Sequence, residues 1–369
     1  MKGAVFLYLV LAVTMLGQEL TPEGYQIATP NPTFSFPQDH GSHPGFRIEW
    51  WYITGKVRDE EGRPFGLQAT FFRYALKPGV EADKEPFGTK DIHMAHMAVS
   101  DIKSGRLLHE ERLNRDGWDA LARVGDLHVQ NGNWSLQRTS GETMALTGSV
   151  RSDAHFALVL KPVKPKLLFG EDGWSKKGVG VENASWYITF PRLAVSGRLS
   201  VDGRERAVSG EAWMDHEISS SQLDKTQVGW DWLSIRLHDQ TEVMLYILRD
   251  GDGQPTAHSK LAWIDREGGL VQRGPAHFNW EVIDTWTSPQ TGGVYPQQIR
   301  LRATRPDGSR VDWTVRPWFA EQEMVGHLGG ISYWEGGCDI LQRGNVIGDA
   351  YLELTGYAEP LAIGSPNSR

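Results

Sequence analysis

The chain has 369 residues and a formal net charge of -8. Its length predicts about two domains, and a hydrophobic fraction of 40% is enough for large cores. No long basic run occurs, which argues against nucleic acid as a partner because phosphate binding needs clustered Lys and Arg. The single cysteine, Cys338, excludes an internal disulfide, and we expect it to be a buried core thiol.

The first segment has the pattern of a signal peptide. Lys2 precedes an apolar run over residues 4–16, and Gly17 follows it. The run is too short for a membrane span, which takes about 20 helical residues. We therefore expect residues 1–17 to be cleaved and the protein to be exported to the periplasm or the medium; a retained membrane anchor is the alternative.

The rest of the chain alternates short runs rich in β-branched and aromatic residues with turn pairs such as Asp202-Gly203. This pattern predicts many short strands, typical of a sandwich or barrel. The strands expected in the first half are 47–57, 65–74, 93–101, 127–130, 143–150, 154–160, 185–190 and 206–215. Those expected in the second half are 228–237, 242–248, 260–264, 277–283, 298–303, 311–315, 332–340 and 351–355. Residues 116–122 are a candidate for one or two helical turns.

This strand content, about sixteen, is that of two eight-stranded barrels. A polar, Ser-rich stretch at 218–227 separates the halves. We place an N-terminal domain at residues 18–219 and a C-terminal domain at 220–369. The sequence thus predicts an all-β fold of two antiparallel β-barrel domains packed against each other.

The sequence lacks the common cofactor and metal motifs. It has no P-loop, no complete dinucleotide fingerprint, no H-E-x-x-H and no G-x-S-x-G. A zinc site of paired cysteines is excluded, and His93 and His96 would point to opposite faces of a strand. We therefore expect neither a cofactor nor a metal.

Two clusters in the first half place ionisable groups among apolar residues. Glu49 shares a strand face with Trp51, and a carboxylate there needs a partner, for which Arg73 on the following strand is the candidate. The pair either closes one barrel end as a structural ion pair or contacts a ligand. His96, inside an apolar strand, is either a core histidine bonded to backbone or a ligand contact.

Two further clusters lie near the middle of the chain. Asp215-His216-Glu217 ends a strand just after Trp213. In an apolar setting burial would raise the pKa of such a carboxyl and keep it protonated, as a general acid requires; the alternative is a solvated strand end. In the strand at 228–237, Trp230 and Trp232 share a face with polar residues, which suits either a ligand wall or core packing.

Several of these motifs together resemble a known family. EWWYITG, FFR, AHMAVSD, GEAWMDHE and GWDWLSIRL, within residues 34–357, are similar to the carotenoid 1,2-hydratases (hydroxyneurosporene synthases) and the related AttH-like bacterial proteins. The resemblance implies two lipocalin-like β-barrel domains. In the hydratases it also implies a carboxylic acid that protonates an isoprenoid double bond, after which water adds to the cation.

By motif position, the resemblance assigns catalytic roles to Asp215, His216 and Tyr246. Ligand contacts are expected from Trp213, Trp230, Trp232, Glu49, Trp51, Arg73 and His96. Aromatic faces can stabilise a cation by up to about 2 kcal/mol each when desolvated. Adjacent residues of a regular strand point to opposite faces, so only one of Asp215 and His216 can line a cavity unless a bulge intervenes.

Two functions of different class remain open. The first is an enzyme that binds a hydrophobic molecule and hydrates or cyclises an isoprenoid-type alkene by general acid catalysis, without a cofactor. The second is an exported, non-catalytic carrier of a lipid or other apolar molecule, associated with a membrane or an export system. Both expect a hydrophobic small molecule as partner, and the substitution Asp215→Asn distinguishes them.

Overall fold

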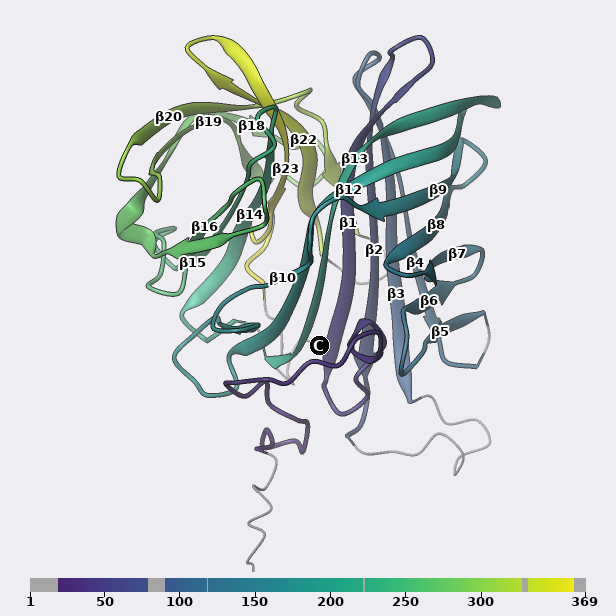
Figure 1. Ribbon diagram of the computed structural model, residues 1–369, viewed down its shortest axis with the longest axis vertical. Helices are drawn as coiled ribbons and strands as arrows, with labels where there is room; N and C mark the ends of the chain where they lie inside the picture. The colour runs from purple at the N-terminus through teal and green to yellow at the C-terminus, as the bar shows by residue number, and fades with distance from the viewer. Residues whose placement is uncertain (1–18, 79–89, 118, 222, 327–330, 362–369) are drawn as a thin grey trace, which may run out of the picture.

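The computed structural model describes residues 19–361 except 79–89, 118, 222 and 327–330 (Figure 1). The only helical segments in those ranges are two three-residue 3-10 turns, η1 (Gln38–His40) and η3 (Pro275–His277). The expected all-β fold is therefore confirmed. The signal peptide predicted at residues 1–17 lies outside the described residues. Among the described residues, no helix has the length and apolarity to cross a membrane.

A sheet of 13 strands occupies the first half of the chain. It curls into a half-barrel on the right of Figure 1. Its strands, in spatial order, are β4 (Arg106–Arg115), β3 (Asp91–Asp101), β2 (Pro64–Ala75), β1 (Ile48–Asp59), β13 (Arg204–Ser221), β12 (Ala184–Val201), β9 (Ala154–Pro162), β8 (Thr143–Val150), β7 (Trp134–Ser140), β6 (His128–Asn131) and β5 (Ala120–Ala122). Two short strands, β10 (Leu167–Leu168) and β11 (Trp174–Lys176), pair with β12.

A second sheet, of 10 strands, occupies the rest of the chain and curls into a nearly closed barrel on the left of Figure 1. Its order is β17 (Leu270–Arg273), β16 (Lys260–Ile264), β15 (Glu242–Asp250), β14 (Gln227–Leu237), β23 (Asn345–Leu354), β22 (Tyr333–Gln342), β20 (Arg310–Pro317), β19 (Val294–Thr304) and β18 (Phe278–Thr287). β21 (Glu323–Met324) pairs with β22. Every strand pairing described in either sheet is antiparallel.

Local sequence explains the longest hairpin. β12 and β13 meet at Asp202-Gly203, whose φ angles of +52° and +74° are those of a type I′ turn, the tight turn that suits twisted antiparallel strands. β9 shows the alternation of a half-buried strand, because Phe156, Leu158 and Leu160 are buried and the residues between them are exposed.

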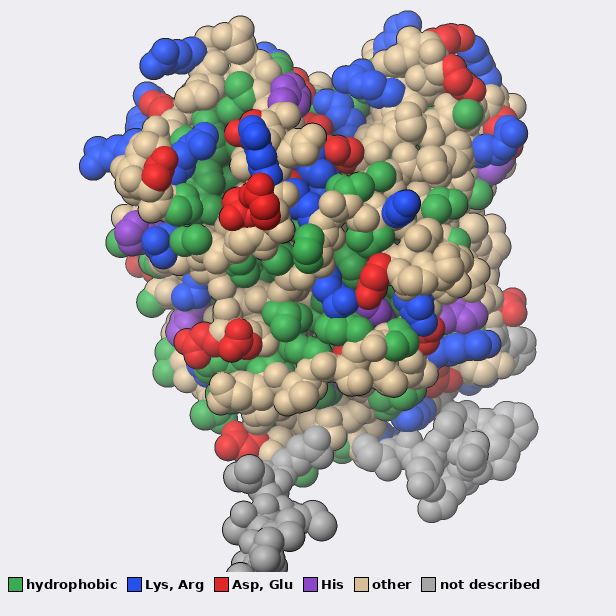
Figure 2. Space-filling model, viewed as in Figure 1, with side chains coloured by type: hydrophobic (Ala, Val, Ile, Leu, Met, Phe, Trp, Pro, Cys, Tyr) green, Lys and Arg blue, Asp and Glu red, His purple; other side chains and the backbone are tan. Residues whose placement is uncertain are grey.

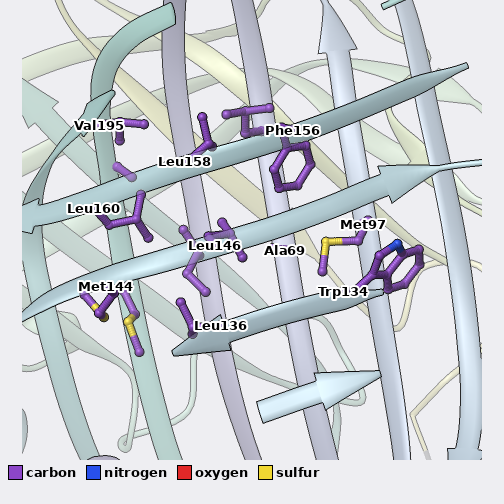
Figure 3. Close-up of a cluster of buried hydrophobic side chains, with 14 of the residues drawn as sticks. Ala69, Met97, Trp134, Leu136, Met144, Leu146, Phe156, Leu158, Leu160 and Val195 are labelled. Atoms are coloured by element: carbon purple, nitrogen blue, oxygen red, sulfur yellow. The ribbon is translucent and has the colours of Figure 1, made fainter. Parts of the chain in front are cut away.

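The core of the first sheet lies inside its curve. Side chains of β7, β8 and β9 pack there against those of β2, β3 and β12, as Figure 3 shows. The labelled residues of this cluster include Met97, Trp134, Leu146, Phe156 and Val195, and each is at most 4% exposed. The second sheet encloses a core of its own, which contains Cys338. The outer face of β1, β2, β12 and β13 is therefore free to meet the second sheet.

Buried polar contacts join the two sheets. Glu242 of β15 is fully buried and pairs with Arg192 of β12 (2.6 Å) and with Lys164 of the β9–β10 loop (2.7 Å). At one end the sheets diverge around a polar cleft lined by Glu211 and Asp349, among others. A notch between the two lobes is visible at the top of Figure 2. The sheets thus meet along part of their length.

The structure differs from the expected elements in several places, of which two are adjacent in the chain and belong to the first sheet. The described part of this candidate helical segment, residues 116–117 and 119–122, contains no helix: Ala120–Ala122 is β5, which pairs with β6. The charged segment Arg106–Arg115 is β4, which the sequence analysis did not predict as a strand. β4 lies at the edge of its sheet and most of its side chains are partly or fully exposed, so its sequence carries little of the apolar alternation that marks a strand.

Candidate functional site

A cavity lies between the two sheets, lined by residues of both. It encloses about 1040 Å³ of space not filled by protein atoms, part of it open to solvent. Most of its lining is aromatic or aliphatic, and several carboxyl groups and one lysine interrupt that apolar surface.

Strand register builds the first wall of the cavity in two rows. Because side chains alternate between faces, residues two apart in each strand share the face that looks at the second sheet. One row crosses five strands through His96, Thr70, Tyr52, Asp215 and Thr189. The neighbouring row crosses the same strands through Met94, Phe72, Trp50, Glu217 and Tyr187.

The opposite wall comes from the second sheet in the same way. Tyr246, Trp232, Glu353 and Glu335 form a row across β15, β14, β23 and β22. Trp230 and Leu248 lie in the next row and also line the cavity. The two sheets therefore face each other across the cavity with aromatic rings and carboxyl groups on both sides.

Asp215 is held by three hydrogen-bond donors. Thr189 Oγ1 (2.6 Å) and Trp213 Nε1 (2.7 Å) donate to Oδ1, and the Tyr187 hydroxyl donates to Oδ2 (2.6 Å). Burial nevertheless raises the pKa of Asp215 to about 7, against those hydrogen bonds, which lower it. Asp215 thus carries a proton for part of the time at neutral pH.

Glu335 and Glu353 form a second acid group. They lie directly opposite each other on adjacent strands, where two negative charges repel. Burial and the neighbouring carboxylate raise the pKa of Glu335 well above its usual value, and burial raises the pKa of Glu353 to about 8. Tyr52 donates a hydrogen bond to Glu335 Oε1. Glu335 Oε2 is buried and has no hydrogen-bond partner among the described residues.

Five of the ten residues predicted for the site line this cavity: Asp215, Tyr246, Trp230, Trp232 and His96. The hydroxyl groups of Tyr246 and Ser175 form a 3.2 Å hydrogen bond, in which either hydroxyl can be the donor. His96 Nδ1 lies 2.6 Å from the Tyr333 hydroxyl, so it bridges the two sheets. Trp213 is fully buried just behind the wall and supports Asp215.

The other four predicted residues lie on the opposite face of the first sheet. His216, Glu49, Trp51 and Arg73 do not line the cavity, which is what alternation along a regular strand requires. Arg73 does pair with Glu49, with Nε 3.1 Å from Oε2. His216 Nε2 lies 3.0 Å from Glu49 Oε1, and its ring stacks on Trp51.

Glu49 is the centre of a buried ion network. His43 Nδ1 lies 2.8 Å from Glu49 Oε1, and hydrogen bonds to Asp39 and Glu49 overcome burial and raise the pKa of His43 to about 9. Two groups of three side chains here have the composition of a metal site: His43, Glu49 and His216, and Asp91, His93 and Asp116. In each group the three possible ligand atoms lie within 4.8 Å of one another. The guanidinium of Arg73 contacts a carboxylate of both groups. A protein cation therefore already balances their charge.

The sequence analysis missed Glu335, Glu353, Tyr52 and Lys177 as lining residues. A usable signal was present for the two glutamates. Each is a carboxylate inside an apolar strand, in Tyr333-Trp334-Glu335 and in Leu352-Glu353-Leu354, which is the pattern that drew attention to Glu49. Nothing local marks Tyr52 or Lys177, because the second sheet completes their surroundings.

The structure is that of an all-β, lipocalin-like protein in which a half-barrel and a nearly closed barrel enclose a cavity between their sheets. The chain belongs to the AttH-like family, whose model matches residues 27–357. It is similar to a crystal structure of a protein designated AttH from Nitrosomonas europaea. That protein is 34% identical with a TM-score of 0.80, over 90% of this chain and 99% of that one. No curated protein sequence matches the chain.

A more distant structure shares the fold. Kievitone hydratase from Nectria haematococca aligns over 92% of this chain and 98% of its own, with a TM-score of 0.66 and 13% identity. At that identity the likeness concerns the arrangement of strands alone.

Proposed function

We propose that this protein binds an apolar, unsaturated small molecule in the cavity between its sheets and hydrates or cyclises it by general acid catalysis. The observation that carries the proposal is a set of three carboxyl groups in an aromatic cavity: Asp215 and Glu335 are buried, and Glu353 is partly buried. Their raised pKa values keep protons available near neutral pH, where a general acid works best.

The hydrogen bonds of Asp215 and Glu335 differ, and this difference indicates different roles for the two carboxyl groups. Both oxygens of Asp215 already accept from donors, so Asp215 suits stabilisation of positive charge. Glu335 has an oxygen without a partner among the described residues, so it suits proton donation. We assign Glu335 as the acid that delivers a proton to the ligand and Asp215 as the facing group.

The proposed reaction balances without a cofactor. The Glu335 carboxylic acid gives its proton to one alkene carbon, which leaves a tertiary cation on the other carbon and a carboxylate on Glu335. Trp50, Trp230 and Trp232 line the cavity, and their ring faces stabilise the cation. Water from the open side adds to the cation, and the proton it loses returns to Glu335. In a cyclisation, a second double bond replaces water as the nucleophile, and the new cation then loses a proton from a neighbouring carbon to the Glu335 carboxylate, which forms a double bond and restores the acid.

The comparisons support a reaction of this class at the level of fold. The structural neighbour named kievitone hydratase shares the arrangement of strands, and its name describes the addition of water. The carotenoid 1,2-hydratase activity that the motifs imply is one member of the proposed class. We further propose that the protein acts after export.

Mass spectrometry of an isoprenoid incubated with the purified protein tests the proposal. A product heavier by one water, formed by the wild type and lost in Glu335→Gln, is the expected result. Glu142→Gln, which changes a partly exposed carboxylate in the turn between β7 and β8, outside the cavity, is the matched control and should keep the activity. An isoprenoid that binds but is recovered unchanged from wild type and variants would contradict catalysis.

That last result would favour the second candidate function, a non-catalytic carrier. One observation supports it: the three donors on Asp215 give this carboxyl a complete structural role without any reaction. In that case Asp215→Asn should change the stability of the protein and leave the bound ligand chemically the same.

A further inference from the structure

One lysine lies at the cavity wall, although a purely apolar ligand would offer its ammonium group no hydrogen-bond acceptor. Lys177 follows β11 and is only 5% exposed. Its backbone N–H donates to Asn183 O (2.8 Å), and its carbonyl accepts from Gln227 Nε2 (2.8 Å). The backbone of Lys177 is therefore fixed on both sides, and its side chain lines the cavity.

The ammonium of Lys177 has fewer acceptors than it has donors. Its Nζ lies 3.1 Å from Glu217 Oε2, which is its only ion-pair or hydrogen-bond partner among the described residues. The rings of Tyr246 and Tyr187 lie 4.4 and 4.7 Å from it. An ammonium donates up to three hydrogen bonds, and a buried one gains from each acceptor it can reach. An acceptor atom of a ligand would complete this shell.

Two other polar side chains of the cavity can also donate a hydrogen bond to a ligand. Glu335 and Glu353 are carboxylic acids over much of the neutral range, and a protonated carboxyl donates one hydrogen bond. The ion pair with Glu217 already neutralises Lys177. The wall therefore favours an oxygen acceptor without its own charge, such as a hydroxyl or carbonyl, over a carboxylate that would repel Glu217.

The shape of the wall places the apolar part of such a ligand. From Tyr187 the row runs through Glu217, Trp50 and Phe72 to Met94, across five adjacent strands. Neighbouring strands are about 4.8 Å apart, so this row spans about 19 Å. Beyond Glu217 its members are apolar. A polar end at Lys177 thus leaves a long apolar track toward Met94.

We propose that the ligand is an elongated apolar molecule with a neutral oxygen acceptor at one end, which Lys177 binds while the apolar body lies along Trp50 and Phe72. This proposal rests on the proposed function, because it names the class of molecule that the same cavity takes. A pure hydrocarbon of equal length lacks the group that Lys177 recognises.

Binding of three matched C20 isoprenoids tests this: geranylgeraniol, geranylgeranoic acid and the corresponding hydrocarbon without oxygen. Affinities follow from displacement of the neutral dye Nile red by each probe. The wild type should bind the alcohol about tenfold or more tightly than the hydrocarbon, since a hydrogen bond to a charged donor is worth that much. Lys177→Met should abolish the preference, and Lys176→Met, whose side chain does not line the cavity, should keep it.

A second variant is expected to gain affinity for one probe, which a misfolded protein would not do. Glu217→Gln removes the competing carboxylate, so geranylgeranoic acid should bind this variant more tightly than it binds the wild type. Equal affinity of the wild type for alcohol and hydrocarbon, or a preference that survives Lys177→Met, would overturn the inference and leave the proposed function intact. Failure of all three probes to bind would instead refute the proposed function.

Discussion

Replacing Asp215 by asparagine should remove one pH-dependent contribution from the free energy of unfolding. Burial raises the pKa of Asp215 from its ordinary value of 3.8 to about 7. The folded state therefore holds this proton more tightly than the unfolded chain does. The stability that results is complete below about pH 3.8 and is lost as the pH rises through about 7. One pKa unit corresponds to about 1.4 kcal/mol, so the total loss is about 4 kcal/mol.

Urea unfolding followed by tryptophan fluorescence, at intervals from pH 5 to 8.5, measures this difference. The Asp215→Asn substitution keeps the shape of the site, because the new amide oxygen can accept from Trp213 and Thr189 and the new NH2 group can donate to the Tyr187 hydroxyl. Over this range the wild type should lose about 3 kcal/mol relative to Asp215→Asn, while the other titrating groups affect both proteins alike. Parallel stability curves would refute the account of Asp215 as a carboxyl whose proton is held by burial.

Three more outcomes follow from the site and the contact between the sheets. Glu335→Gln should slow hydration by about 10²- to 10⁴-fold, the usual contribution of one positioned acid. Ligand affinity, from quenching of tryptophan fluorescence, should change much less, and equal losses of rate and affinity would argue for a structural role. The hydration rate of the wild type should not fall as the pH rises from 4 to 6, through the ordinary pKa of a glutamate, because burial and Glu353 hold the pKa of Glu335 well above its usual value; a rate that falls tenfold per pH unit there would contradict Glu335 as the acid. Glu242→Ala should lower the free energy of unfolding by about 3 kcal/mol, because the buried cations Arg192 and Lys164 would lose the carboxylate that both contact, while Arg192 keeps Glu211 and Lys164 keeps two carbonyl acceptors; a loss below about 1 kcal/mol in urea would contradict this.

Much of the fold could be predicted from local sequence, because turns and strand alternation are local properties. Asp202-Gly203 marks a hairpin, and the structure has a type I′ turn there. The alternation of Trp50 and Tyr52 with Glu49 and Trp51 separates the two faces of β1 correctly. The curvature of each sheet is not local: a nearly closed barrel and a half-barrel differ in how distant strands meet, and the strand pattern alone does not distinguish them.

Only the part of the candidate site that lies on the first sheet could be predicted from the sequence. The apolar setting of Asp215 could be inferred from its neighbours in sequence, and the structure buries this carboxyl among aromatic residues. Glu335 and Glu353 reach the same cavity from strands more than 100 residues further along the chain. Their role depends on the packing of two sheets, and the residues around them in sequence show only that each carboxylate lies in an apolar strand.

A crystal structure of the protein soaked with geranylgeraniol tests the central claim most directly. The account predicts electron density for the ligand between the two sheets, with its chain against Trp50 and Trp230 and a double bond within reach of Glu335. Density for the ligand only elsewhere on the molecule, with this cavity still filled by solvent, would contradict it.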